Sequence, residues 1–204
     1  MSSQEALYDS MVADVVTITN RPDLAEETKV AVRTATLSVH MLESFPRDVS
    51  TELVKLPNAF YVAGFDTQVL FPRFRGVSTI RILDSSFAPV EFPAIDVVEL
   101  GDIYDPIYGT LKNNIAYAAG TSLNVRCAVP AYGCLVEYFH LPQVRRESYN
   151  SWIAQLYPEP IIYKAASIVL ATNGNEEKSK SLDTYCKLTL NPQLTQNFLT
   201  SAMR

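Results

Sequence analysis

The chain has 204 residues, of which 48% are hydrophobic and 19% are charged. Because a chain this apolar can offset the entropy of ordering, the composition excludes a disordered protein and predicts one core, or one core with a smaller appended module. The formal net charge of -5 opposes tight binding to DNA or to an anionic membrane. No run reaches the ~18 apolar residues of a membrane span, and the first residues lack the layout of a signal peptide, so we expect a soluble protein made in the cytoplasm.

Two N-terminal segments, residues 4–19 and 24–45, have apolar residues at helical spacing. The first stripe is Ala6, Met11, Val12, Val15, Val16 and Ile18, and the second is Ala31, Ala35, Val39, Leu42 and Phe45. Between them, Asp23 with Glu26 three positions later resembles a capping box. Pro46 is expected to end the second helix, because proline disfavours the helical conformation of the preceding residue. The pattern predicts a packed helix pair, with the small side chains of Ala31 and Ala35 allowing close approach.

From residue 52 to residue 141 the chain changes to short β-rich pieces separated by proline and glycine. The predicted strands are residues 56–62, 78–83, 94–100, 115–127 and 134–141, and the fourth is two alternating runs about a turn at Gly120. Residues 130–133, Pro-Ala-Tyr-Gly, are expected to form a further turn, which makes the last strands a meander.

Two parts of this β-rich region are candidates for interactions. Residues 65–76 combine arginine with aromatic side chains, and we favour a subunit interface there over phosphate or base binding in an acidic protein. The interface candidates are Phe71, Arg73, Phe74 and Arg75. Residues 91–105 carry scattered acids, which usually form a solvated edge and lack the spacing of a calcium loop. These acids are Glu91, Asp96, Glu99, Asp102 and Asp105.

The C-terminal part is predicted to be helical again. A short helix is expected over residues 148–156, and a second over 161–172 because Pro158 and Pro160 suit the first turn and Gly174 suits the cap after the end. Asn175 can start a last helix that ends before Pro192. Residues 193–204 show no clear period, and we expect them to be disordered alone or ordered by a partner.

No residue pattern points to catalysis, so we expect no enzyme activity, cofactor or metal. The two histidines, His40 and His140, have no neighbouring ligands at metal-binding spacing, and structural roles are expected for both. Gly-rich phosphate loops, nucleophile elbows and dinucleotide fingerprints are absent from the sequence. The three cysteines, Cys127, Cys134 and Cys186, leave one unpaired in any scheme, and buried thiols are favoured over a contact of Cys127 and Cys134 across a hairpin.

The order of the sequence features resembles one known family, the head-to-tail adaptor proteins of tailed bacteriophages, which include connector and tail tubular proteins. The resemblance covers about residues 4–190 and lies in the order of several motifs. They are Asn20-Arg21-Pro22-Asp23-Leu24 at the helix joint, Tyr117-x-x-x-Gly120, Leu123-x-Val125 and Leu135-Val136-Glu137-Tyr138-Phe139-x-x-Pro142 in the β region, and Trp152-Ile153, Leu156-Tyr157-Pro158 and Ala165-Ala166 after it.

This resemblance implies a structural virion protein of α+β fold, with a helical bundle formed by both ends of the chain and an inserted antiparallel β module. The implied parts are residues 1–50 and 146–190 for the bundle, 51–145 for the β module, and 191–204 for an extended tail. The family forms a dodecameric ring below the portal, at the head–tail junction of the virion. The implied partners are the portal protein, a tail nozzle or other tail proteins, further copies of the chain, and DNA that passes without specific binding.

The resemblance also implies roles for particular residues. The C-terminal tail is expected to reach the portal through Leu190, Leu194, Phe198, Leu199, Met203 and Arg204. Acidic residues that line a DNA channel repel phosphates and keep DNA mobile, and we expect some of the five acids of residues 91–105 to do this. Two alternatives stay open: a tail completion or tube protein without portal contact, and a stand-alone β module that binds a protein or glycan. An enzyme ranks third.

Overall fold

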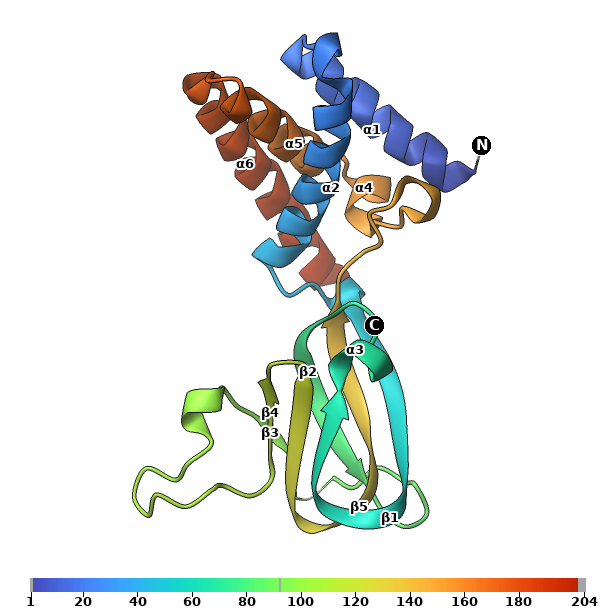
Figure 1. Ribbon diagram of the computed structural model, residues 1–204, viewed down its shortest axis with the longest axis vertical. Helices are drawn as coiled ribbons and strands as arrows, with labels where there is room; N and C mark the ends of the chain where they lie inside the picture. Colours follow the sequence, from blue (N-terminus) through green and yellow to red (C-terminus); the bar gives the residue numbers. More distant parts are fainter. Residues whose placement is uncertain (1, 92, 202–204) are drawn as a thin grey trace. The chain divides into compact units, whose positions relative to one another are not determined.

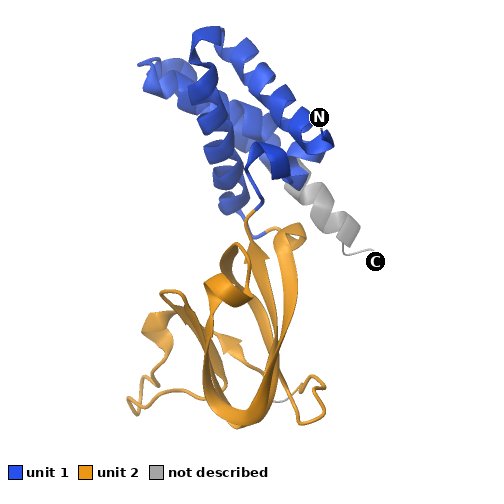
Figure 2. Cartoon of the chain, turned by 45° about the vertical axis from the view of Figure 1, so that its right-hand side comes forward, with its two compact units in different colours: residues 1–44, 142–204 blue, residues 45–141 orange. Residues whose placement is uncertain are grey.

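A computed structural model describes residues 2–91 and 93–201, with side chains described up to residue 190. The protein is a mixed α+β structure that divides into two compact units (Figure 2). The helical unit consists of Met1–Ser44 and Pro142–Arg204, and the strand unit is Phe45–Leu141. Among the described residues, no helix combines the length and apolar character needed to cross a membrane.

In the helical unit, α5 packs against three other helices, α1, α2 and α6. Its elements are α1 (Ser3–Thr19), η1 (Pro22–Leu24), α2 (Ala25–Leu42), η4 (Arg146–Ser148), α4 (Trp152–Leu156), α5 (Glu159–Thr172) and α6 (Glu176–Ser201) (Figure 1). Ala165 and Ala166 on α5 and Ala35 on α2 have no exposed surface. Because alanine side chains are short, the two helix backbones can lie close together, as the sequence predicts.

Helix α1 buries a stripe that differs in part from the one predicted. The sequence signal for its start is Ser2, whose side chain accepts a hydrogen bond from the Glu5 backbone while Glu5 binds the Ser2 backbone in return. The fully buried residues are Tyr8, Met11, Val15 and Thr19. Of the other predicted residues, Val12, Val16 and Ile18 are half-buried, and only Ala6 is exposed, so the prediction is wrong there. The two polar members are accommodated because the Tyr8 hydroxyl donates to the Lys29 carbonyl and the Thr19 hydroxyl donates to the Val15 carbonyl, each at 2.8 Å.

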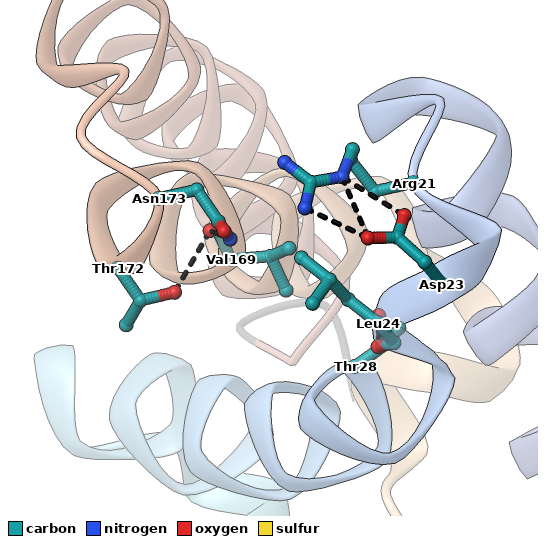
Figure 3. A network of polar contacts seen from close by, with 7 residues as sticks. All are labelled: Arg21, Asp23, Leu24, Thr28, Val169, Thr172 and Asn173. Atoms are coloured by element: carbon teal, nitrogen blue, oxygen red, sulfur yellow. Dashed lines mark hydrogen bonds and ion pairs between the residues drawn. The ribbon is translucent and has the colours of Figure 1, made fainter.

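The predicted capping box at the start of α2 is also wrong. The carboxylate of Asp23 is bound by the guanidinium of Arg21, with Nη2 and Oδ2 2.8 Å apart, and α2 begins without a side-chain cap (Figure 3). Helix α2 ends at Leu42, which is exposed, and Phe45 is buried only after the chain has left the helix. The hydrophobic stripe therefore stops at Val39.

Helices α5 and α6 begin largely as predicted, α4 begins at Trp152 and so is shorter than the predicted 148–156, and only α6 ends differently. Pro160 lies in the first turn of α5, and Gly174 follows the helix at a φ of +75°, a conformation that glycine adopts without strain. The Asn175 side chain accepts from the Lys178 backbone at the start of α6. Helix α6 then runs through Pro192 to Ser201, so the predictions of an end before Pro192 and of an extended tail are wrong.

The strand unit is built around β5 (Ser122–His140), which is paired along both edges. Its other elements are η2 (Pro46–Asp48), β1 (Val49–Asp66), α3 (Thr67–Leu70), β2 (Phe74–Leu83), β3 (Asp96–Val97), η3 (Leu100–Asp102) and β4 (Ile115–Ala119). One edge of β5 pairs with β1, and the other pairs with β4 near its start and with β2 near its end. Strand β3 is parallel to β4, so the sheet is mixed and not purely antiparallel as expected. Strand β3 is also shorter than the predicted strand 94–100.

The expected turn at residues 130–133 does not form, because β5 continues through it as one strand. Irregular pairing in the partner strand accommodates this stretch: the β1 register shifts between Lys55 and Phe60 and again before Val62. Gly133 pairs with Lys55, and a Cβ atom at this glycine would overlap the Val54 carbonyl. Pro130 is tolerated here because ladder hydrogen bonds are already interrupted at a bulge.

Candidate interaction surfaces

The predicted interface residue Phe71 belongs to the core of the strand unit. Its side chain has no exposed surface, and its ring lies 5.3 Å from that of Tyr138 and 6.0 Å from that of Phe74. Phe74 is half-buried in the same cluster. Phe71 therefore cannot offer its side chain to a neighbouring subunit, and its prediction is corrected to a core role.

The two arginines of this segment have contacts within the strand unit. Arg73 adopts a φ of +58°, and its guanidinium donates to the Leu141 carbonyl at 2.7 Å. Arg75 lies over the Phe139 ring, 6.0 Å from its centroid. Arg73 is exposed and Arg75 half-buried, so an intermolecular role for these two residues stays a prediction.

The five predicted channel acids lie between β2 and β4. Glu91, Asp96, Glu99 and Asp102 are exposed, in agreement with a solvated edge. Asp105 differs, because its Oδ1 accepts hydrogen bonds from the backbones of Ile107 at 2.8 Å and Tyr108 at 3.0 Å. These bonds, that of Tyr108 first, lower the pKa of Asp105 below its ordinary value of 3.8 and give the carboxylate a structural role in a turn. That any of the five faces a DNA channel stays a prediction.

The segment around Asp105 forms a loop that points away from the strands, which we call the projecting loop (residues 99–111; Figure 1). Its backbone is closed by hydrogen bonds from Asp105 N to the Thr110 carbonyl at 2.7 Å and from Gly109 N to the Asp105 carbonyl at 2.9 Å. Ile103 is buried and anchors the loop, whereas Ile107 is 80% exposed and Tyr108 is 79% exposed. An ordered turn with two large apolar side chains in water is a candidate contact surface.

A second candidate surface lies on the sheet. Leu53 on β1, Leu135 on β5 and Arg81 on β2 pair directly across three strands and therefore point to the same face. Leu53 is 49% exposed, Arg81 is exposed and Leu135 is half-buried. Lys55, two residues beyond Leu53, is exposed beside this row, with its ammonium 4.7 Å from the centroid of the Phe87 ring. We call these four residues, Leu53, Lys55, Arg81 and Leu135, the outer sheet face.

Sequence reasoning missed both surfaces. The available signal for the projecting loop was the pair Ile107-Tyr108 between Pro106 and Gly109, because turn positions are normally polar. No such signal existed for the outer sheet face, since strand pairing alone brings Leu53, Leu135 and Arg81 together.

Both histidines have the structural contacts that we expected. His40 is fully buried on α2, with Nε2 2.9 Å from Ser151 Oγ, and Ser151 in turn accepts from the Ala154 backbone at the start of α4. His140 Nδ1 lies 3.0 Å from Ser50 Oγ on the neighbouring strand. In the part of the chain that the structure describes, no three His, Cys, Asp or Glu side chains are grouped to hold a metal ion.

The cysteines are buried free thiols, as predicted. Cys127 and Cys134 lie on the same strand, so their placement across a hairpin is wrong. Burial raises the pKa of Cys127 to about 11 and that of Cys134 to about 12, where the neighbouring Cys127 adds to the effect. These thiols are poor nucleophiles at neutral pH.

The segment after Pro142 binds the N-terminal helices through the ion pairs of Arg146 and the buried contacts of Tyr149. Arg146 contacts Asp9 on α1 with both ends of its guanidinium, at 2.6 and 2.8 Å, and lies 3.6 Å from Glu5. The fully buried Tyr149 places its hydroxyl 2.7 Å from Thr36 Oγ1 on α2. Thr36 Oγ1 also contacts the Val32 carbonyl at 2.8 Å, and the Tyr149 hydroxyl also contacts Met11 Sδ at 3.6 Å, so the two hydroxyls belong to one buried polar cluster.

Of the predicted portal-binding residues, Leu190 is buried in the helical unit. The side chains of Leu194, Phe198 and Leu199, and the whole of Met203 and Arg204, lie outside the described residues. Comparison with family models and with curated proteins found no match to this chain.

Proposed function

We propose that this chain is a structural virion protein, a head-to-tail adaptor that forms a ring below the portal, joins capsid to tail and surrounds the DNA exit channel. The proposed partners are the portal protein, a tail nozzle or other tail proteins, and further copies of the chain. DNA passes through the channel without specific binding.

The observation that carries the proposal is the division of the chain. Helices from before and after the insertion share one unit around α5, and the inserted residues form a separate strand unit. This is the order of parts that the resemblance implies, with the four long helices α1, α2, α5 and α6 as the proposed bundle. Two compact units on one chain can contact two different neighbours, as an adaptor requires.

The exposed apolar residues of the strand unit support an assembly role. Ile107 and Tyr108 on the projecting loop have large exposed areas, and such residues on a folded surface are typical of protein contacts. The buried thiols and hydrogen-bonded histidines have structural explanations, so the described side chains offer more to assembly than to chemistry.

The test is the mass of the purified full chain by light scattering, alone and after addition of the portal protein from the same virus. We expect a ring-sized complex with portal, and its loss in a variant truncated after residue 193, which removes five of the six proposed portal contacts but keeps Leu190. Unchanged fluorescence of Trp152 in the truncated variant shows that the helical unit remains folded. A chain whose mass is indifferent to portal would overturn the adaptor function and favour a tail protein without portal contact.

A further inference from the structure

We infer that the projecting loop of one copy docks on the outer sheet face of a second copy, so that neighbouring subunits join through their strand units. The inference rests on the proposed ring and names the surfaces by which subunits meet in it.

The loop is ordered before it meets a partner. The Asp105 carboxylate holds the backbones of Ile107 and Tyr108, and the loop base is closed from Lys112 N to the Ile103 carbonyl at 2.9 Å. Docking an ordered loop costs little further conformational entropy, so most of the free energy from burying Ile107 and Tyr108 remains available for association.

The strand order places the loop and the β1 residues of the outer sheet face at opposite edges of the sheet, whereas Arg81 lies on β2, which pairs with β5 and contacts β3. In the sheet order β1-β5-β4-β3, the loop follows β3 at one edge, and Leu53 and Lys55 lie on β1 at the other edge. Figure 1 shows the loop pointing away from the strands. The loop therefore meets Leu53 and Lys55 on another copy. Because the two surfaces are unlike, a pair of joined copies still has one loop and one outer sheet face free, and the contact propagates into a ring or filament.

Charge complementarity favours a second copy of this chain as the partner that binds the outer sheet face. Residues 84–111, which include the loop, contain six acidic residues and no lysine or arginine. The rest of the strand unit contains seven lysines or arginines and only four acidic residues. On the outer sheet face, Lys55 and Arg81 flank the apolar pair Leu53 and Leu135. Glu137 shares this face, and its carboxylate accepts a hydrogen bond from the Thr79 hydroxyl at 2.6 Å. The two basic residues of the face match the acidic surroundings of the loop, and its apolar pair matches the apolar loop tip.

The contact assigns a different neighbour to two of the acids expected to line the channel. Glu99 and Asp102 lie at the ends of the short η3 turn within the loop. When Ile107 and Tyr108 cover the outer sheet face, these carboxylates lie toward the basic residues of the adjacent copy. They then strengthen the subunit contact, and the acids that repel DNA lie outside the loop.

Cysteine cross-linking of the full chain tests the geometry. A chain carrying both Leu53→Cys and Tyr108→Cys is expected to give a ladder of dimers, trimers and larger species under mild oxidation, because unlike surfaces join head to tail. The three native cysteines are buried and do not interfere. The matched control pairs Tyr108→Cys with Val30→Cys, an exposed position on α2, and is expected to give no ladder.

Charge exchange tests the pairing. Sedimentation velocity of Arg81→Glu is expected to show self-association weakened by about tenfold or more. Combining it with Glu99→Lys and Asp102→Lys is expected to restore the association, whereas Arg145→Glu, the same charge change on an exposed residue of the helical unit, leaves it unchanged.

The two proposals fail separately. A chain that stays monomeric at all concentrations, or a ladder equally strong in the Val30→Cys control, would overturn the docking of the loop even if portal binding is found. A ladder with rescue by charge exchange, in a chain that ignores portal, would keep the contact between copies and overturn the adaptor function.

Discussion

Replacing Tyr149 tests how the segment after Pro142 holds the N-terminal helices. Its ring lies edge-on to that of Tyr8 with centroids 5.4 Å apart, and its hydroxyl forms a hydrogen bond with that of Thr36 at 2.7 Å. Burial of an aromatic side chain removes about 150–250 Å² from water, which at about 25 cal/mol per Å² gives an upper value of about 4–6 kcal/mol. Since measured aromatic-to-alanine changes in cores cost about 3–5 kcal/mol, we expect Tyr149→Ala to destabilise the helical unit by that amount.

Tyr149→Phe separates the hydroxyl from the ring. It keeps the packing on Tyr8 and removes one buried hydrogen bond, so the expected loss is about 0.5–1.5 kcal/mol. The matched control is Tyr108→Ala, which removes an exposed tyrosine and is expected to change stability by less than about 0.5 kcal/mol.

The assay is urea unfolding followed by the fluorescence of Trp152, the single tryptophan of the chain. Because Trp152 lies on α4 against His40, its signal reports on the helical unit, while far-ultraviolet circular dichroism reports on both units. A loss below about 1 kcal/mol for Tyr149→Ala, or equal losses for the alanine and phenylalanine variants, would refute the role of the buried ring.

Three further predictions concern charge, thiols and backbone packing. Hydrogen bonds from Arg146 lower the pKa of Asp9 below 3.8, so this pair stabilises the folded state above that pH, and the contribution is lost as pH falls through the lowered pKa. Urea midpoints from Trp152 fluorescence are therefore expected to fall less steeply between about pH 5 and 2 in Asp9→Asn than in the natural chain. Equal slopes for the two chains would contradict a stabilising Arg146–Asp9 pair. Ellman's reagent at pH 8 is expected to label none of the three cysteines in the folded chain and all three in guanidinium; rapid labelling without denaturant would show that the thiols are not buried. Gly133→Ala is expected to destabilise the strand unit by about 1–3 kcal/mol, because the new methyl group meets the Val54 carbonyl. The near-neutral control is Gly76→Ala, where no heavy atom lies within 4 Å of the added Cβ. Unfolding of both variants is followed by circular dichroism, and equal stability would argue against this packing at Gly133.

Local chemistry was enough to predict several features. The mixed α+β class, the start of α5 at its prolines, the cap at Gly174 and the turn at Gly120 follow from the conformational preferences of single residues and from short periods. Burial of the cysteines and structural contacts for the histidines also follow from residue type. The backbone features depend on interactions within a few residues of the chain, whereas the histidine contacts join residues far apart, His40 with Ser151 and His140 with Ser50.

Features set by distant partners required the tertiary structure. Residues 130–133 have the composition of a turn, yet they stay extended, because Ala131 and Gly133 pair with β1 across its register shift and Gly133 also pairs with β2. Phe71 lies in a segment that reads as an exposed loop, and only the neighbouring Tyr138 ring shows that it is core.

The candidate site divides in the same way. The sequence alone shows the acidic character of residues 84–111 and the unusual apolar pair Ile107-Tyr108 in a turn. The outer sheet face exists only because β1, β5 and β2 pair in one register, which brings Leu53, Leu135 and Arg81 together from positions far apart in the chain. Sequence by itself thus determined which residues carry charge and apolar surface, and strand pairing decided which of them share a face, because backbone hydrogen bonding between distant segments sets the register.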